Sequence, residues 1–356
     1  MSKTFQPLFT DRAKCPCPQG IRFGRCACSL LSLSFAIFAT VANSGYFGQR
    51  CADDIRAALG AVLNKNIPAD LREITARPPV YHLLGVPDKV LGKHLNHVWK
   101  GLAGIPSADE PGIPVVVKYL PNAAQLDIEL ACGLASQVLK LPVPSPGLVI
   151  AAPEDLPGRP TGMKGSSVVL FGSLFQPPDP FMARHAADGE FGEEHIWESV
   201  CFNDTGRVGA AWDELVANPD RHAQNLLFDG VKWWLFDHNL ALEPVTKLYK
   251  AIADGNSQQD VVMYMARINQ LLTQLVKRRP EDHGIEDEAA KFARHAQRLK
   301  MLAIEMGRWN LPAEGRVTAI IKMAALIVDL IALRLEPLHL YLAQRLQRPT
   351  AGTLWN

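Results

Sequence analysis

The stretch NPDRHAQNLLFDGVKWWLFDHN, residues 218–239, decides the prediction of fold and function. Two apolar segments flank an Asp-Gly pair, which suits a type I′ hairpin turn because both positions tolerate positive φ. Folding the chain back there brings Asn225 and Asp237 to one open end, with Asp220 in the loop that enters it. Two carboxylates and a carboxamide then share a small volume, which suits Mg²⁺, a hard cation that prefers oxygen ligands.

The order of these three side chains is that of a kinase catalytic loop followed by its metal-binding aspartate. The local sequence motif Asp-Arg-His-x-x-Asn resembles that of the HipA-like kinases and, more distantly, that of the phosphatidylinositol 3- and 4-kinases. The resemblance implies that Asp220 is the catalytic base and that Asn225 and Asp237 bind the metal. It also implies that Arg221 and His222 support the loop. The alternative, a surface hairpin with acidic ends, leaves the order of the three residues unexplained.

A lysine and a glutamate precede this motif in the order that a kinase requires. Residues 112–120 form a β-branched run that carries a single lysine, Lys118. A buried strand rarely holds an unpaired lysine, because removing the charge from water is costly. A helix is predicted over 126–139, with Glu129 in its first turns and the small residue Gly133 on the same face. By the resemblance, Lys118 binds nucleotide phosphates and pairs with Glu129; the alternative is a strand-end lysine that reaches water.

Further predicted strands complete a small lobe around this helix. They fall within residues 80–102, over 147–151 and over 166–172. By the resemblance, the last strand leads into a hinge whose backbone binds adenine, which makes Val169 and Phe171 candidate nucleotide-binding residues. The chain has no G-x-G-x-x-G loop. Candidates for a turn that covers the phosphates are Gly85, Gly92, Gly101 and Gly104.

Helical periodicity dominates the rest of the chain. The predicted helical segments are 194–217, 247–254, 259–277, 287–306 and 317–347. The first of them ends just before the catalytic loop, as a rigidly held site needs. The apolar stretch 319–333 is interrupted by Lys322 and Asp329, which favours a buried amphipathic helix over a membrane span.

The fold class predicted from these elements is α+β, with a bilobal protein-kinase-like fold. A small β-rich N-lobe with a preceding helical segment is expected over 45–172. A mostly helical C-lobe with a helical C-terminal extension is expected over 173–356. The catalytic hairpin 218–239 lies in this second lobe.

Residues 1–44 do not resemble the rest of the chain. Basic residues precede a short apolar run, 30–42, which resembles a secretory signal but falls short of the roughly 20 residues that span a membrane. A disordered or spurious extension is the preferred interpretation, with a signal or anchor as the alternative. The same segment holds Cys15, Cys17, Cys26 and Cys28, which could bind Zn²⁺, although C-x-C spacing is unusual for structural zinc.

Composition narrows the functional classes. The net charge is +1 and the sequence has no long basic run, so it does not predict binding to the phosphates of nucleic acid. An odd count of 7 cysteines favours a reduced, cytoplasmic protein, and a membrane role is not expected.

The predicted function is an ATP- and Mg²⁺-dependent phosphotransferase. The resemblance implies a serine/threonine kinase with a protein acceptor and an antitoxin-like partner; a lipid or small-molecule kinase and a nucleotide-binding pseudokinase are the alternatives.

Overall fold

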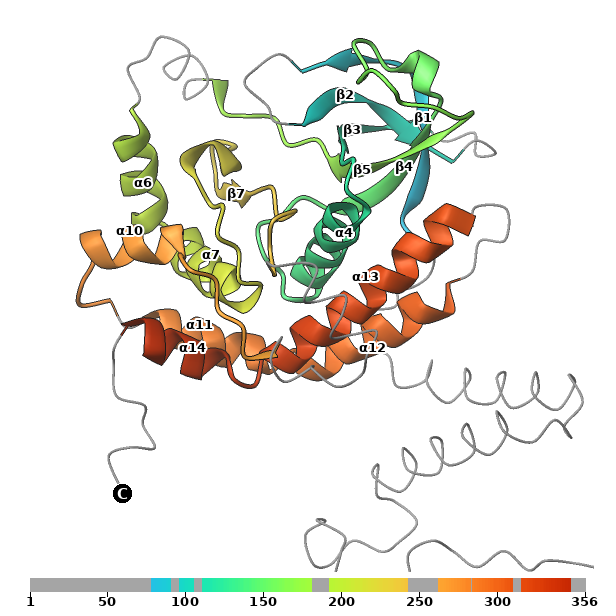
Figure 1. Cartoon of the computed structure of the whole chain (residues 1–356). Helices are drawn as coiled ribbons and strands as arrows, with labels where there is room; N and C mark the ends of the chain where they lie inside the picture. The colour runs from blue at the N-terminus through green and yellow to red at the C-terminus, as the bar shows by residue number, and fades with distance from the viewer. Residues whose placement is uncertain are drawn as a thin grey trace, which may run out of the picture. The chain divides into compact units, whose positions relative to one another are not determined.

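The computed structural model describes residues 78–90, 96–105, 111–180, 192–242, 262–282, 284–309 and 315–346. All of them belong to one compact unit, residues 68–356. The predictions for residues 1–44, for Gly92 and for a helix over 247–254 lie outside the described residues. Within them the protein is mixed α+β, with a small β-rich N-terminal part followed by a helical C-terminal part (Figure 1).

The N-terminal part is a closed five-stranded barrel with the strand order β1-β2-β3-β5-β4 (Figure 1). The strands are β1 (Val80–Lys89), β2 (His97–Gly104), β3 (Ile113–Tyr119), β4 (Pro146–Ala151) and β5 (Val168–Leu174). Neighbouring strands are antiparallel except β1 and β4, which pair in parallel with Val80 opposite Leu148 and so close the barrel. The strands predicted from the sequence are therefore confirmed, with shifted ends.

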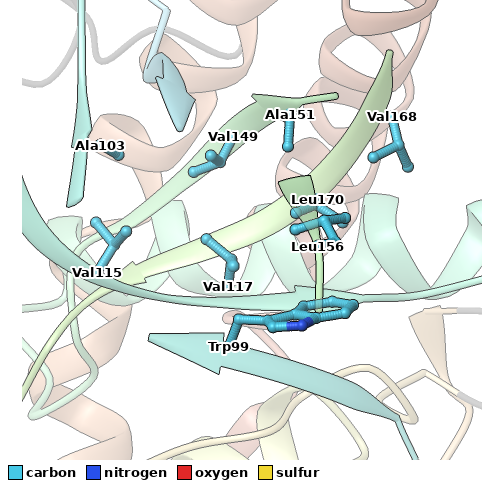
Figure 2. Packing of buried hydrophobic residues seen from close by; sticks show 9 residues of the cluster. All are labelled: Trp99, Ala103, Val115, Val117, Val149, Ala151, Leu156, Val168 and Leu170. Carbon is cyan, nitrogen blue, oxygen red and sulfur yellow. The ribbon is translucent and has the colours of Figure 1, made fainter. Parts of the chain in front are cut away.

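Alternating residues fill the barrel interior. Figure 2 shows the buried cluster, which contains Trp99, Ala103, Val115, Val117, Val149, Ala151, Leu156, Val168 and Leu170. The indole of Trp99 is fully buried and donates to the carbonyl of Pro157 at 2.8 Å. Because side chains alternate between the two faces of a strand, Lys118 belongs to the outer face, together with its register partners Val98 and Phe171.

Helix α4 (Ala123–Val138) packs closely against the barrel. It begins at Asn122, whose side chain accepts from the amide of Ala124 at 3.0 Å, a standard N-cap. A β-carbon on Gly133 would lie 2.6 Å from Cβ of Pro146, so only glycine permits this approach of helix to strand β4. The small face that the sequence predicts is thus used, and it places Glu129 in a buried position.

The C-terminal part contains α6 (Glu193–Phe202), α7 (Asp204–Leu215), α10 (Gln270–Arg278), α11 (Gly284–Ala293), α12 (Ala296–Arg308), α13 (Gly315–Arg334) and α14 (Leu338–Leu346). Helix α13 packs along both α4 and α12 (Figure 1). This agrees with the buried amphipathic helix predicted there. None of the helices in the described ranges is sufficiently long and apolar to cross a membrane.

Three predicted helices are each divided in two, and single residues explain two of the breaks. The segment 194–217 divides at Asn203, whose side chain accepts from the amide of Thr205 at 3.0 Å and so starts α7 as a new helix. The segment 317–347 divides before Pro337, because proline cannot donate within a helix and clashes with the preceding turn. The segment 287–306 divides between α11 and α12.

A fourth predicted helix, 259–277, begins later than expected. Among its described residues, the helix α10 starts only at Gln270. The side chain of Asn269 accepts from the amide of Leu272 at 3.0 Å. This N-cap fixes the start of the helix and leaves the residues just before it irregular.

The hairpin predicted within residues 218–239 forms, but its turn differs from the prediction. Strands β6 (Leu226–Phe228) and β7 (Trp233–Leu235) pair antiparallel, and a four-residue loop joins them. Within this loop only Gly230 has a positive φ, +96°, so the type I′ prediction is wrong. The side chain of Asp229 instead accepts from the amides of Val231 and Lys232, both at 2.8 Å, which stabilises a longer Asx-type turn.

Two backbone hydrogen bonds hold the hairpin near the barrel. The amide of Leu235 donates to the carbonyl of Pro142 at 2.8 Å, in the connection between α4 and β4. The amide of Asp179 donates to the carbonyl of Phe228 at 2.8 Å. Residues 175–179, which follow β5, therefore lie against the hairpin, so the hairpin is fixed next to the start of the segment that links the two parts.

Candidate active site

The loop that precedes the hairpin is closed by its own asparagines. The side chain of Asn218 donates to Asp213 at 3.1 Å and accepts from the amide of Asp220 at 3.1 Å. Residues Ala223–Asn225 form a short 3₁₀ turn, η3, and the Asn225 side-chain amide donates to the carbonyl of Asp220 at 2.8 Å. This bond fixes the orientation of the Asn225 carboxamide and leaves its oxygen available as a ligand.

Arg221 is the centre of this loop. Its side chain is 0% exposed and donates through Nε and Nη2 to both oxygens of Asp213, at 3.0 and 2.9 Å. Its Nη1 donates to the carbonyl of Asn225 at 3.2 Å and to the carbonyl of Phe236. One buried guanidinium therefore ties α7 to the two residues that flank the hairpin, Asn225 before β6 and Phe236 after β7.

Replacing Arg221 with Met is expected to lower the free energy of unfolding by about 3–5 kcal/mol, because the buried Asp213 carboxylate loses its cation. The double variant Asp213→Asn/Arg221→Met should recover part of that loss. Urea unfolding measures both. Arg308→Met is the control, because Arg308 pairs with Glu305 at the surface and should cost at most about 1 kcal/mol. A loss for Arg221→Met as small as the control's would contradict the buried pair.

Lys118 and Asp237 meet at the end of the hairpin. The Lys118 ammonium lies 2.6 Å from the Asp237 carboxylate, and the two side chains are 13% and 30% exposed. Asp237 has φ +58°, a left-handed conformation that Asp and Asn tolerate better than other non-glycine residues. In this conformation the Asp237 side chain contacts Lys118 on strand β3.

Glu129 does not form the predicted ion pair with Lys118. One oxygen of its buried carboxylate accepts from the amide of His238 at 2.9 Å, and the other lies 3.9 Å from Nδ1 of the same histidine. Lys118 takes the neighbouring Asp237 in its place. Asp237 and His238 are consecutive, so both contacts can form side by side. Glu129 accepts from the backbone amide of His238, and Lys118 donates to the side chain of Asp237.

His238 is neutral and links Arg221 to Glu129. Its Nε2 lies 2.9 Å from Nη2 of Arg221, and because arginine only donates, Nε2 must accept and the proton sits on Nδ1, facing Glu129. Burial, together with the charges of Arg221 and Lys118, holds the pKa of His238 well below its usual value. The ring also packs edge-on against Trp212, with centroids 5.9 Å apart.

Burial raises the pKa of Glu129 to about 7, partly offset by the positive charge of Lys118. Between pH 4.5, the ordinary pKa of a glutamate, and about pH 7, the unfolded chain loses this proton while the folded protein keeps it. The protonated carboxyl therefore contributes stability at low pH that is lost as the pH rises through about 7.

Glu129→Gln should remove this pH dependence, because glutamine can still accept from the His238 amide. The expected result is that the wild type loses stability relative to Glu129→Gln between about pH 5 and about pH 8. Urea unfolding across this range measures it, with the exposed residue Glu154 changed to Gln as the control. Parallel pH profiles for wild type and Glu129→Gln would contradict the buried, protonated carboxyl.

Asp220 and His222 lie beside these groups. Desolvation raises the pKa of Asp220; the nearby His222 lowers it, and the charge of Asp237 raises it further. The amide of His222 donates to the carbonyl of Asp220 at 3.0 Å and its own carbonyl accepts from the amide of Asn225 at 2.9 Å, so His222 supports the loop through its backbone.

Val169 and Phe171, the predicted hinge residues, lie within β5. Val169 pairs with Ile150, and Phe171 lies between Lys118 and Leu148. Both are buried, at 5% and 8% exposed. Their backbones belong to the sheet ladder, so a contribution to a nucleotide site would come from side chains, above all that of Phe171 beside Lys118.

Three residues of the site escape the sequence analysis: Asp213, Asn218 and His238. Asp213 is hidden in the polar pattern of a predicted helix, and only its burial, 0% exposed, marks it. Asn218 and His238 stand in the quoted stretch, and His238 is noticeable because it follows Asp237 where kinases of the Asp-Phe-Gly type carry phenylalanine. The partners of His238, which are Arg221 and Glu129, come from separate elements, and spacing in the sequence cannot reveal such contacts.

The donor set can be tested against Mg²⁺. Within the described ranges no group of three or more His, Cys, Asp or Glu side chains forms a metal cage. Asp237 and Asn225 supply one carboxylate and one free carboxamide oxygen, and a cation, the ammonium of Lys118, already lies against Asp237. This fits Mg²⁺, which binds through one or two protein oxygens and completes its shell with water and substrate phosphates.

The protein is thus a mixed α+β protein in which Lys118 of the barrel contacts Asp237, which follows the β6–β7 hairpin of the helical part. No family model matches the chain, and no curated protein matches it in sequence. Among solved structures, the chain is similar to the Helicobacter pylori proinflammatory kinase CtkA. The TM-score is 0.39 and the identity 12%, over 71% of this chain and 96% of that one.

Proposed function

We propose that the protein is an ATP- and Mg²⁺-dependent phosphotransferase with a bilobal kinase-like fold, in which the barrel is the N-lobe and the helical part the C-lobe. The single observation that carries the proposal is the 2.6 Å contact between Lys118 of the barrel and Asp237 of the hairpin. Asp220 and Asn225 stand in the loop that Arg221 ties to the same hairpin. Phosphoryl transfer needs this combination of a cation, oxygen ligands for metal and a base.

Each residue has a role in the proposed reaction. Lys118 exchanges Asp237 for the nucleotide phosphates, while Asn225 and Asp237 supply oxygen ligands to Mg²⁺. The ion that Asn225 and Asp237 would hold would supply positive charge against the phosphoryl oxygens. Asp220 orients the acceptor hydroxyl and takes its proton. Glu129 keeps Asp237 in place by holding the amide of His238.

The proposed acceptor is a serine or threonine hydroxyl of a protein, because the motif at residues 220–225 resembles that of the HipA-like kinases. The proposed location is the cytoplasm, where ATP is available. An antitoxin-like protein is one candidate acceptor or partner. A lipid headgroup or a small molecule is the second candidate, because the same wording is also similar to the inositide kinases.

The test is transfer of labelled γ-phosphate from ATP to the protein itself and to a cell lysate, with Mg²⁺ and with EDTA. Transfer that requires Mg²⁺ supports the proposal, and the labelled protein band or lipid identifies the acceptor class. A melting temperature raised by ATP and Mg²⁺ without transfer would indicate a nucleotide-binding pseudokinase. If neither transfer nor a shift in melting temperature occurs, the proposal fails.

A further inference from the structure

The last turn of α7 is held on two sides. Asp213 faces the loop, where it binds Arg221 and Asn218. The next residue, Glu214, is 1% exposed and points to the C-terminal helices. Its carboxylate accepts from Nε and Nη2 of Arg345 on α14, at 2.5 and 2.9 Å, and from the side-chain amide of Asn269 at 3.0 Å.

A second arginine binds the carbonyl groups at the end of α7. Arg334, the last residue of α13, is 0% exposed and donates to the carbonyl of Leu215 at 2.6 Å and of Glu214 at 3.4 Å. It also donates to the carbonyls of Val262 and Tyr264, at 2.8 and 2.7 Å. A cation at this position complements the negative end of the α7 dipole and satisfies carbonyls that the helix leaves unpaired.

The chain leaves α7 in a strained conformation. Ala217 has φ +48°, which is unfavourable for alanine and persists only where the surroundings fix it. The fixing contacts lie on either side: the amide of Asn218 donates to the carbonyl of Asp213 at 2.8 Å, and that of Leu242 donates to the carbonyl of Val216 at 2.8 Å. The direction in which the loop departs therefore depends on how firmly α7 is held.

The same C-terminal helices reach the other half of the site. Helix α13 packs along α4, which carries Glu129 (Figure 1). At its C-terminal end α13 presents Arg334 to α7. One helix of 20 residues thus contacts both the element behind Glu129 and the element that ends in the catalytic loop.

We propose that Arg345 and Arg334 are positioning residues of the phosphotransfer site: the C-terminal helices hold the catalytic loop in its active geometry through Glu214 and the end of α7. The inference rests on the proposed function and deepens it. Neither arginine touches the reacting groups; both act through α7, Asp213 and Arg221. Lys118, the proposed phosphate-binding residue, lies on the barrel strand β3 and is contacted by neither arginine, so the expected loss falls mainly on the catalytic step that depends on Asp220.

The test compares Arg345→Ala with Arg308→Ala, whose arginine forms a surface ion pair with Glu305 on the same helix, α12. Both are assayed at a temperature at which circular dichroism shows them folded. For Arg345→Ala, kcat is expected to fall about tenfold while KM for ATP changes less than about twofold. Amide hydrogen exchange should become faster over residues 216–225 and stay slow in the barrel strands. Arg308→Ala should match the wild type in each measurement.

Wild-type kcat and wild-type exchange over 216–225 in folded Arg345→Ala would overturn the inference. A lower kcat without faster exchange there would also overturn it, because the loss would not act through the loop. If Arg345→Ala does not fold, Arg345→Lys, which keeps the charge beside Glu214 but loses the two-pronged geometry, is judged by the same two measurements. If the wild type transfers no phosphate, the proposed function fails, and exchange over 216–225 still decides whether Arg345 holds the loop.

Discussion

Asp220→Asn is expected to lower the rate of phosphate transfer by about 10²–10⁴-fold, the usual contribution of a general base. Asparagine is nearly the same size as aspartate but cannot take a proton from the acceptor. The hydrogen bonds that close the loop use the backbone of Asp220 and not its carboxylate: its amide donates to the Asn218 side chain, and its carbonyl accepts from the Asn225 side chain. The fold and melting temperature should therefore be retained.

The measurement is initial-rate transfer of labelled phosphate, together with the shift in melting temperature that ATP and Mg²⁺ produce. Asp220→Asn should keep that shift, because Asp220 is not a proposed metal ligand. The matched control is Asp155→Asn, an exposed aspartate on the 3₁₀ turn η2 (Pro153–Asp155). A variant that keeps more than about half of the wild-type rate would exclude Asp220 as the base.

Asp237→Asn is expected to reduce transfer by at least about 10²–10³-fold, as for the loss of one charged group that stabilises the transition state. In contrast to Asp220→Asn, this variant should also lose the Mg²⁺-dependent part of the nucleotide shift. Asparagine is the appropriate replacement, because Asp237 has φ +58° and Asn tolerates the left-handed region while alanine would be strained. Loss of activity can then be separated from loss of the local fold.

Titration of Mg²⁺ at fixed ATP, monitored by the melting temperature, checks this expectation. The Asp220→Asn variant is the control, because it removes one carboxylate of the same loop-and-hairpin site and leaves Asp237 in place. An Asp237→Asn protein that shows the wild-type Mg²⁺ response would remove Asp237 from the metal site. The contact with Lys118 would then be an ordinary ion pair.

Much of the architecture is predictable from local sequence. The β-branched run before Lys118, the helix with Glu129 and the two later strands are confirmed because their apolar patterns match the burial that the fold imposes. The convergence of Asn225 and Asp237 also follows from the sequence, because two short strands joined by a tight loop can only bring their outer ends together. The amide of Phe236 indeed donates to the carbonyl of Asn225 at 3.0 Å.

The details that fail are those that depend on distant partners or single capping residues. The partner of Lys118 is Asp237 and not Glu129 because a tertiary contact decides between two nearby carboxylates. The helix breaks at Asn203 and Pro337 and the turn at Asp229 depend on one side chain each, and hydrophobic periodicity does not detect them. The role of Asp213 requires knowledge that Arg221, eight residues later, is buried against it.

The closure of the barrel by β1 and β4 has a consequence for self-association. A strand at the edge of an open sheet presents unpaired amides and carbonyls that can recruit a strand from another molecule. In the described part of the chain, each barrel strand pairs with a neighbour on both sides, so the N-terminal part offers no such template. Outer edges remain on the hairpin of β6 and β7, where each strand has 3 residues, which is short for a stable intermolecular ladder. On heating, aggregation should therefore begin only after the barrel has opened, and a change that stabilises the β1–β4 pairing should delay aggregation.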